Sequence, residues 1–562
     1  MSTIVIQKSR APSTAALLPR WSKHVVTKLG GRDPLGLSRL AQFLTDYLLT
    51  GIVINTDRAR YYALYTWILW HVEQEHLDGS WEAFQQAFQR REAAIALATL
   101  LADPESSPVG KRAVSDHLAK DGDDLDTQFK VLPANDLGGF GQYYGGSLHA
   151  LGLTMRREAG ADIVNPQRPI AVQLAEAVHA TVVDTPYVRD RCFDRARVSR
   201  TDLTASAARL GIDGIALDIA GHERDLLIDL FFGFDQKRPD PATTLRRRSL
   251  ARLLVTVQAY NQANLVISDE DLGEALVFAP SYFGVLAAEG SAPVPFAPPA
   301  SLVECTSFWR QFCLHGYLTL ALEGLLAAVL QVLEYQPGGL ALDAVLDELL
   351  ASRFVTYAAE RVGGPSDSPR AMLSALGLAS VPDEAACSSA AARMSFDSAV
   401  SERVYRHDAS TPAEQAARSC VLLAVLYARW RASTDRAYAV AGERGGAEPS
   451  APSVLPRLDT WFDAAVTWRD VLHHLVTLLV TQHDRVMYDK GRLDSCWLHR
   501  DGDLLVRDQD CEPTLRSSRH TQAAHILVDL GVLTWAPLAE TKSLILTSAG
   551  EAVLARALAV ES

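Results

Sequence analysis

The chain is expected to be mostly α-helical, with several domains and a small winged-helix-like α+β unit at its C-terminus. Ala and Leu are abundant, whereas aromatic residues make up only 8% of the 562 residues, and this composition favours helix over sheet. Apolar residues recur with the spacing of one helix face along most of the chain, and strand-like alternation is confined to the C-terminal region. A chain of this length can form about two to four domains, each with its own core.

An N-terminal helical domain is expected over residues 1–290. It begins with a basic segment, residues 1–40, in which seven Lys and Arg residues are accompanied by a single acid, Asp33. Thr56 and Ser80 are the expected caps of two helices, because their hydroxyl oxygens can accept hydrogen bonds from a first turn. Helical patterns cover residues from 34 onward, 56–76, 80–103, 169–181, 201–209, 222–232 and 243–263.

The proline-rich sequence SAPVPFAPP, at 291–299, is the clearest boundary in the chain. The central helical domain, residues 300–440, follows it and contains a Ser-, Ala- and Gly-rich insert at 362–412. Residues 316–335 of this domain are apolar enough to resemble a membrane span. A buried helix is nevertheless expected there, because Glu323 would be costly in lipid.

The C-terminal domain, residues 456–562, is expected to begin with a long helix over 459–487. Residues 518–530 then have a helical pattern that ends at Gly531, and VLTWAPLAETKSLILT alternates like a short β-hairpin before a last helix. Helix, hairpin and helix in this order are typical of a winged-helix unit. A helical domain with a small β-flap has the same outline, so both structures stay open.

Net charge and cysteine content limit the partners and the compartment. The net charge of −13 argues against a general nucleic-acid coat, which needs a basic surface, but a local basic patch could still contact phosphate. The seven cysteines are scattered and odd in number, which suits reduced thiols in the cytoplasm. No sustained apolar run follows the basic residues of the N-terminus, so neither a secretory signal nor a membrane partner is expected.

The stretch TDRARYYALYTWILWH combines two arginines with many aromatic residues. The aromatic residues fall on helical stripes, which are usually core. Arg58 and Arg60, however, lie in the first turns, where a positive charge opposes the helix dipole. Their partner is expected to be either a buried carboxylate, such as that of Asp46 or Asp57, or a phosphate or protein partner held by Arg58, Arg60 and Tyr61.

One catalytic arrangement can be read in the sequence. Asp529, Glu540 and Lys542 imitate the Asp…Glu-x-Lys pattern that holds magnesium in many nucleases, but the nearby sequence lacks the strands that such a site needs. Glu540 and Lys542 are more simply the polar tip of the hairpin. The histidines and cysteines lack the spacing of a zinc site, so neither a metal nor a cofactor is predicted.

Two basic clusters remain, RRR at 246–248 and the pair Arg516 and Arg519. Each is most simply a solvated helix face. If the C-terminal unit is a winged helix, Arg516, Arg519 and Lys542 would lie near its recognition helix and wing, where such domains meet DNA phosphates. These three residues are therefore the candidate nucleic-acid contacts.

The sequence contains several distinctive short motifs: LGLSR, TDRARYY with WILW, GQYYGGSLHALGL, QHDRVMYDKGR and LVDLGVL. Together they resemble a group of large uncharacterised bacterial proteins of unknown function. Genes for such proteins often lie beside anti-phage or mobile-element genes, so the resemblance implies a component of a bacterial defence system. It implies no catalytic residues.

The leading hypothesis is a non-enzymatic recognition or scaffold subunit of a multi-gene bacterial defence system. Such a subunit would bind a protein encoded in the same gene cluster, or DNA, in the cytoplasm. The alternative is an effector enzyme, most simply a metal-dependent nuclease that uses Asp529, Glu540 and Lys542.

Overall fold

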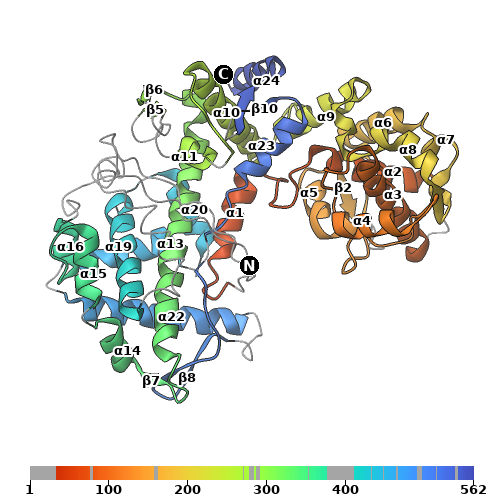
Figure 1. Ribbon diagram of the computed structural model, residues 1–562. Helices are drawn as coiled ribbons and strands as arrows, with labels where there is room; N and C mark the ends of the chain where they lie inside the picture. The colour runs from red at the N-terminus through yellow and green to blue at the C-terminus, as the bar shows by residue number, and fades with distance from the viewer. Residues whose placement is uncertain are drawn as a thin grey trace. The chain divides into compact units, whose positions relative to one another are not determined.

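The structure is a computed structural model of a mostly helical protein, as the sequence predicts (Figure 1). Residues 1–32 of the predicted basic segment and residues 376–410 of the predicted insert lie outside the described residues. The structure describes residues 33–75, 80–156, 162–269, 271–277, 284–286, 292–351, 353–375, 411–431, 433, 435–446, 449–463, 466–489, 496–513, 515–537 and 542–561.

The chain packs into two compact units, and neither is continuous in sequence. The three consecutive domains expected from the sequence remain a prediction. Unit 1 contains the described residues up to 44, 273–298 and 306–517, and unit 2 contains 45–272, 299–305 and 518–562.

Helix α2 (Ala59–Gln74) is the central helix of unit 2. Thirteen of its sixteen residues are buried, and burial on all sides is typical of a helix enclosed by others. Helices α3 (Trp81–Ala102) and α6 (Pro169–Val182) pack against α2, and α8 (Arg200–Leu210) packs against α3 (Figure 1). The aromatic stretch of the sequence is therefore the wall of a core.

Short elements complete this part of unit 2. The strand pairs β1–β4 and β2–β3 are antiparallel. The elements are α4 (Lys111–Lys120), β1 (Asp124–Asp126), the π-helix η1 (Phe140–Tyr144), α5 (Gly145–Ala150), β2 (Thr154–Arg156), β3 (Asp162–Val164), α7 (Pro186–Arg189), η2 (Cys192–Asp194), β4 (Arg197–Ser199), η3 (Ile212–Ala216), η4 (Asp218–Ala220) and α9 (Gly221–Phe232).

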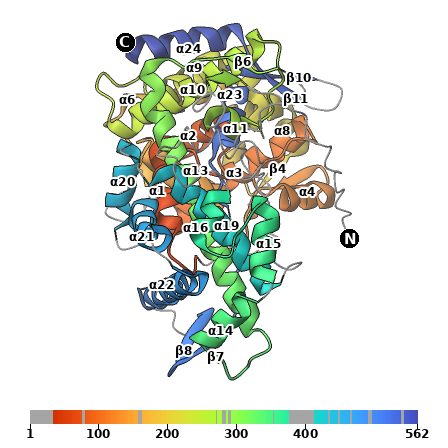
Figure 2. The same cartoon turned by 90° about the vertical axis from the view of Figure 1, so that its left-hand side faces the viewer.

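The C-terminal segment of unit 2 consists of a helix, a hairpin and a helix. Helix α23 (His520–Asp529) leads into the antiparallel strands β10 (Leu533–Pro537) and β11 (Lys542–Leu546), and α24 (Ser548–Glu561) follows. Helix α10 (Pro241–Gln262) packs against both β11 and α24, and Figures 1 and 2 show it beside α24. The order of elements matches the one expected from the sequence.

Unit 1 is a helical assembly with a small sheet at one end. The long helix α13 (Val303–Leu333) contains the apolar segment that the sequence predicts to be a buried helix. It is the one helix of the described chain that is long and apolar enough to cross a membrane, and 94% of its most apolar window is buried in the structure. Helix α19 (Pro412–Trp430) begins with a capping box formed by Thr411 and Glu414.

The remaining elements belong wholly or mostly to unit 1. Strands β7, β9 and β8 form a three-stranded antiparallel sheet in that order. The elements are α1 (Ser38–Leu48), α11 (Leu272–Val277), β5 (Val285–Leu286), β6 (Val294–Pro295), β7 (Leu340–Ala341), α14 (Leu342–Leu349), α15 (Arg353–Val362), α16 (Pro369–Ala375), α20 (Arg436–Gly445), α21 (Ala451–Asp463), α22 (Trp468–Asp489), β8 (Leu498–Asp501) and β9 (Leu504–Arg507), and η5 (Ala300–Leu302) belongs to unit 2.

Two expectations about helix boundaries are wrong. The helix expected over 459–487 is two helices, because Thr467 and Asp470 cap a new start: the Thr467 hydroxyl donates to the Asp470 carboxylate at 2.6 Å. Thr56 does not cap α2, since its hydroxyl accepts a hydrogen bond from Val53 N at 2.8 Å and Arg58 is the N-cap residue. The Ser80 cap of α3 is confirmed.

Strands also occur outside the C-terminal region, contrary to the prediction. Each strand before residue 490 contains only two or three of the described residues. Segments of this length are too short to show a period of two, and hydrogen bonds to a distant partner determine their conformation.

Candidate functional site

The charged residues around the start of α2 form one network in unit 2. Arg58 Nε lies 3.0 Å from Asp529 Oδ2, and Arg58 Nη2 lies 2.6 Å from Asp213 Oδ1. Asp529 Oδ2 also accepts a hydrogen bond from the Ala59 N–H at 3.0 Å. The network, here called the α2 cluster, consists of Asp57, Arg58, Asp213, His525 and Asp529.

The carboxylate of Asp529 explains how an arginine can stand at the N-terminus of a helix. The Arg58 side chain makes no capping hydrogen bond, and its charge opposes the helix dipole. Asp529 supplies both the missing acceptor and a negative charge. Burial raises the pKa of Asp529 even though Arg58 opposes the shift. Burial lowers the pKa of Arg58, but Asp529 and Asp213 outweigh it and raise that pKa.

Arg60 meets a carboxylate inside the core. The side chains of Arg60 and Glu223 are both 0% exposed. Arg60 Nε donates to Glu223 Oε1 at 3.0 Å and Nη2 donates to Oε2 at 3.2 Å, while Nη1 donates to the Gly211 carbonyl. This bidentate geometry is the strongest arrangement of an arginine–carboxylate pair. A phosphate or a partner protein would have to displace Glu223 to reach Arg60.

Tyr61 is part of an aromatic cluster in the core of unit 2. Its hydroxyl oxygen accepts a hydrogen bond from Val109 N at 2.8 Å. Its ring lies 5.3 Å from that of Tyr65 and 5.1 Å from that of Tyr144, measured between centroids. Burial raises the pKa of Tyr61. Its side chain is 3% exposed, so the structure places it in the core.

A buried acid that the sequence analysis missed lies beneath these rings. Glu92 accepts hydrogen bonds from the Tyr65 hydroxyl and from Gly139 N, each at 2.8 Å. Burial raises the pKa of Glu92 to about 7. Gly138 has a positive φ of 51°, and a Cβ there would lie 1.9 Å from Glu92 Oε2. The paired glycines of LGGFGQYY were the sequence signal for this buried acid, because a residue without a Cβ leaves space for the carboxylate.

His525 completes the α2 cluster on its exposed side. Its Nδ1 lies 3.5 Å from Asp57 Oδ2, and its Nε2 lies 3.3 Å from Asp269 Oδ2. Hydrogen bonds to Asp269 and Asp57 raise the pKa of His525 to about 9, so the ring carries a charge at neutral pH. Each of the four aspartates near the start of α2 thus lies beside Arg58 or His525.

The three candidate nucleic-acid contacts differ in their exposure and in their partners. Arg519 is 8% exposed, and its Nη1 donates to Asp46 Oδ1 at 2.5 Å and to the Ile52 carbonyl at 3.0 Å. Arg516 belongs to unit 1, where its Nη2 lies 4.0 Å from Asp33 Oδ1. Lys542 is exposed at the start of β11. Of the three, Lys542 is the residue whose side chain is open to solvent.

The nuclease arrangement can be placed only in part. Asp529 is engaged by Arg58 and by the first turn of α2, Lys542 is exposed, and Glu540 lies outside the described residues. Among the residues that the structure describes, no three His, Cys, Asp or Glu side chains are grouped so that they could hold a metal ion.

The RRR cluster is paired within unit 2: Arg246 and Arg247 are buried, and the Arg248 side chain is 24% exposed. Arg246 Nε donates to the Phe231 carbonyl at 2.7 Å, at the C-terminal end of α9, where a positive charge complements the helix dipole. Arg247 and Arg248 both pair with Glu561, at 2.7 and 2.6 Å. These contacts join α24 to α10 within unit 2.

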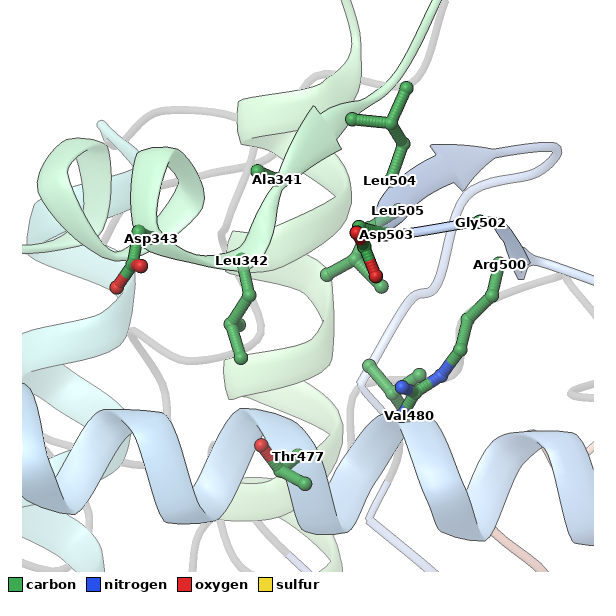
Figure 3. Close-up of a pocket in the computed structure, with 10 residues that line it drawn as sticks. All are labelled: Ala341, Leu342, Asp343, Thr477, Val480, Arg500, Gly502, Asp503, Leu504 and Leu505. Atoms are coloured by element: carbon green, nitrogen blue, oxygen red, sulfur yellow. The ribbon is translucent and has the colours of Figure 1, made fainter.

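Two cavities lie in unit 1, between α22 and the β8–β9 hairpin. The end of α22 belongs to the motif QHDRVMYDKGR, which the sequence analysis singled out without assigning it a binding role. One cavity of about 300 Å³ includes Thr477, Val480 and Leu504 in its lining, and a wider one of about 910 Å³ includes Asp484 and Tyr488. Figure 3 shows the first, with Arg500 reaching down toward Val480. The α22 groove is defined as both linings: Ala341, Leu342, Asp343, Thr477, Val480, Asp484, Arg485, Tyr488, Cys496, His499, Arg500, Gly502, Asp503, Leu504, Leu505, Asp508 and Gln509.

Arg500 is common to both cavities and divides the groove. Its Nε lies 3.5 Å from Asp484 Oδ2, a loose ion pair between two half-exposed side chains. His499 Nδ1 lies 2.6 Å from Asp508 Oδ2 on the neighbouring strand segment. Thr477 Oγ1 is buried in the groove wall, and no group within the described ranges forms a hydrogen bond with it.

Comparison with known proteins found no family model, no curated protein and no solved structure that matches this chain.

Proposed function

We propose that this protein is a non-catalytic recognition or scaffold subunit that binds a macromolecular partner in a multi-gene bacterial defence system. One observation carries the proposal. Three of the charged side chains that the sequence offers for catalysis or anion capture are engaged inside unit 2: Arg58 pairs with Asp529, and Arg60 pairs with Glu223. Groups used in this way satisfy one another inside the unit and leave recognition to its surfaces.

The C-terminal segment of unit 2 is proposed to be a variant winged helix. Besides the helix–hairpin–helix order, a third stretch of backbone meets the hairpin: Leu544 N of β11 donates to the Ile267 carbonyl at 2.9 Å. In this reading α23 is the recognition helix, although its Asp529 is engaged at the start of α2. DNA contact is therefore proposed for the hairpin, with Lys542 meeting a phosphate.

The alternative function is a metal-dependent nuclease that uses Asp529, Glu540 and Lys542. A magnesium ion would need the Asp529 carboxylate, which now accepts hydrogen bonds from Arg58 and Ala59. If Asp529 bound magnesium instead, the Ala59 N–H in the first turn of α2 would lose its acceptor. The nuclease function therefore requires a rearrangement of this region, whereas the scaffold function requires none.

An assay of the purified full chain with DNA and RNA, with and without magnesium, separates the two functions. Salt-sensitive binding without cleavage is expected, and K542A should weaken that binding for all sequences and lower the salt slope by about one. Cleavage that depends on magnesium and is lost in E540A would establish the nuclease instead.

Co-expression with the products of the neighbouring genes tests the partner directly. A complex that survives size-exclusion chromatography at moderate salt is expected for at least one of these proteins. If every neighbour elutes separately and deletion of this gene leaves phage resistance unchanged, the scaffold proposal is overturned.

A further inference from the structure

The α22 groove has the length of a short peptide site. Its α22 wall runs from Thr477 to Tyr488, and at 1.5 Å per residue this distance is about 16 Å. An extended peptide of about five residues has the same length. The opposite wall comes from the β8–β9 hairpin, as Figure 3 shows for the narrower cavity.

Large apolar side chains are exposed at both cavities of the groove. Leu504 is 37% exposed at the narrower cavity, and Tyr488 is 73% exposed at the wider one. Val480 and Leu505 line the narrower cavity behind Leu504. Exposed apolar residues that gather in a concave surface are typical of a contact site. Two apolar side chains of an extended ligand would fit these positions.

The charged lining of the groove is acidic. It contains four aspartates and two arginines: Asp343, Asp484, Asp503, Asp508, Arg485 and Arg500. The Asp343 side chain is 80% exposed, although it pairs with Arg469 at 3.1 Å, and no described residue forms an ion pair with Asp503. Such a surface repels phosphates and attracts lysine and arginine side chains.

We propose that the α22 groove binds an extended, Lys- and Arg-rich segment of a partner protein. Its basic side chains would meet Asp343 and Asp503, and its apolar side chains would contact Leu504 and Tyr488. The inference rests on the proposed function, because it names the chemistry of the partner that a recognition subunit would bind.

Fluorescence anisotropy with the full chain tests the groove. The probe is a labelled eight-residue peptide in which Lys or Arg alternates with Leu, and a second peptide carries Glu in place of each basic residue. The double variant D343N/D503N should weaken binding of the basic peptide about tenfold, because each of its two substitutions removes a negative charge that attracts the peptide. Y488A should weaken it at high salt as well, because its contribution is apolar.

A matched variant controls for the net charge of the chain. D116N/D123N removes two exposed acids of unit 2 and should leave the affinity unchanged. Equal loss in both double variants, or equal binding of the acidic peptide, would overturn the proposal. A gain in affinity when Lys8, Arg10, Arg20, Lys23, Lys28 and Arg32 are all replaced by Gln would also overturn it, by identifying the chain's own basic segment as the occupant.

The proposed function and this inference can fail separately. If the complex with a neighbouring gene product forms equally well with D343N/D503N and with the unaltered chain, the groove is not the partner site, but the scaffold function stands. If no such complex forms while the basic peptide binds as expected, the groove stands and the proposed function fails.

Discussion

The α2 cluster and the α22 groove differ in how their charges are used. In the α2 cluster Arg58 contacts two carboxylates, and in the core nearby both side chains of the Arg60–Glu223 pair are 0% exposed. In the α22 groove Arg500 and Asp484 are 48% and 44% exposed and lie 3.5 Å apart. Buried charges that already satisfy one another cannot bind a ligand without leaving a partner unpaired, whereas loosely paired charges beside exposed apolar residues remain able to bind one.

The largest effect is expected for R60M. Removing the guanidinium leaves Glu223 as an unpaired buried charge, so the free energy of unfolding should fall by about 3–5 kcal/mol. Urea denaturation measures the loss. The double variant R60M/E223L should recover most of it, since no buried charge then remains. A loss below about 1 kcal/mol in R60M would break the comparison, because it would show that the fold does not depend on this pair.

A smaller loss is expected for D529A. This variant removes the acceptor of the Ala59 N–H and the partner of Arg58, so the free energy of unfolding should fall by about 1–3 kcal/mol. D213A, whose carboxylate is 43% exposed, is the matched control and should cost less than about 1 kcal/mol. Equal losses in the two variants would contradict the capping role of Asp529.

The pH dependence of stability should report on His525. Its folded pKa of about 9 lies above the ordinary value of 6.5, so the folded state holds the proton more tightly. The contribution of His525 is therefore complete below pH 6.5 and is lost as the pH rises through about 9. Solvent screening limits it to about 1 kcal/mol, because the side chain is 35% exposed. Thermal unfolding between pH 6 and 9.5 should show a smaller decline in H525Q than in the unaltered chain.

The smallest effect on folding is expected in the groove. In urea denaturation, D343N/D503N should lower the free energy of unfolding by less than about 1 kcal/mol, because the pair of Asp343 with Arg469 is exposed and Asp503 is exposed as well. A clear loss of stability would instead assign these aspartates to the fold, and the contrast between the two regions would disappear.

Local patterns predicted most of the helices. The cap at Ser80 and the periodicity of residues 169–181 lead to α3 and α6 because the signals lie within one or two turns. The helix expected over 459–487 was wrong since a Thr–Asp cap within a continuous apolar pattern starts a new helix. Such a cap competes with the helical pattern of apolar residues, and packing against the rest of the protein determines whether one helix or two helices form.

Partners distant in sequence could not be predicted. The sequence shows that Arg58 and Arg60 need anions, but the chain has 67 acidic residues, and the expected Asp46 and Asp57 are not the ones used. Asp46 pairs with Arg519, and Asp57 lies beside His525. The motif QHDRVMYDKGR marks the α22 side of the α22 groove, but the concave surface could not be predicted, because its lining combines residues of α22 with residues 341–343 and 496–509.

The cap that Asp529 places on α2 has a consequence for biosynthesis. The Ala59 N–H and its acceptor are separated by 470 residues, so the first turn of α2 cannot be completed until nearly the whole polypeptide has left the ribosome. Nascent chains that stop before α23 would leave Arg58 and the Ala59 N–H without Asp529, and incompletely packed chains of this kind are typical clients of chaperones and proteases. Full-length synthesis is in this way coupled to the maturation of the earliest-made helices.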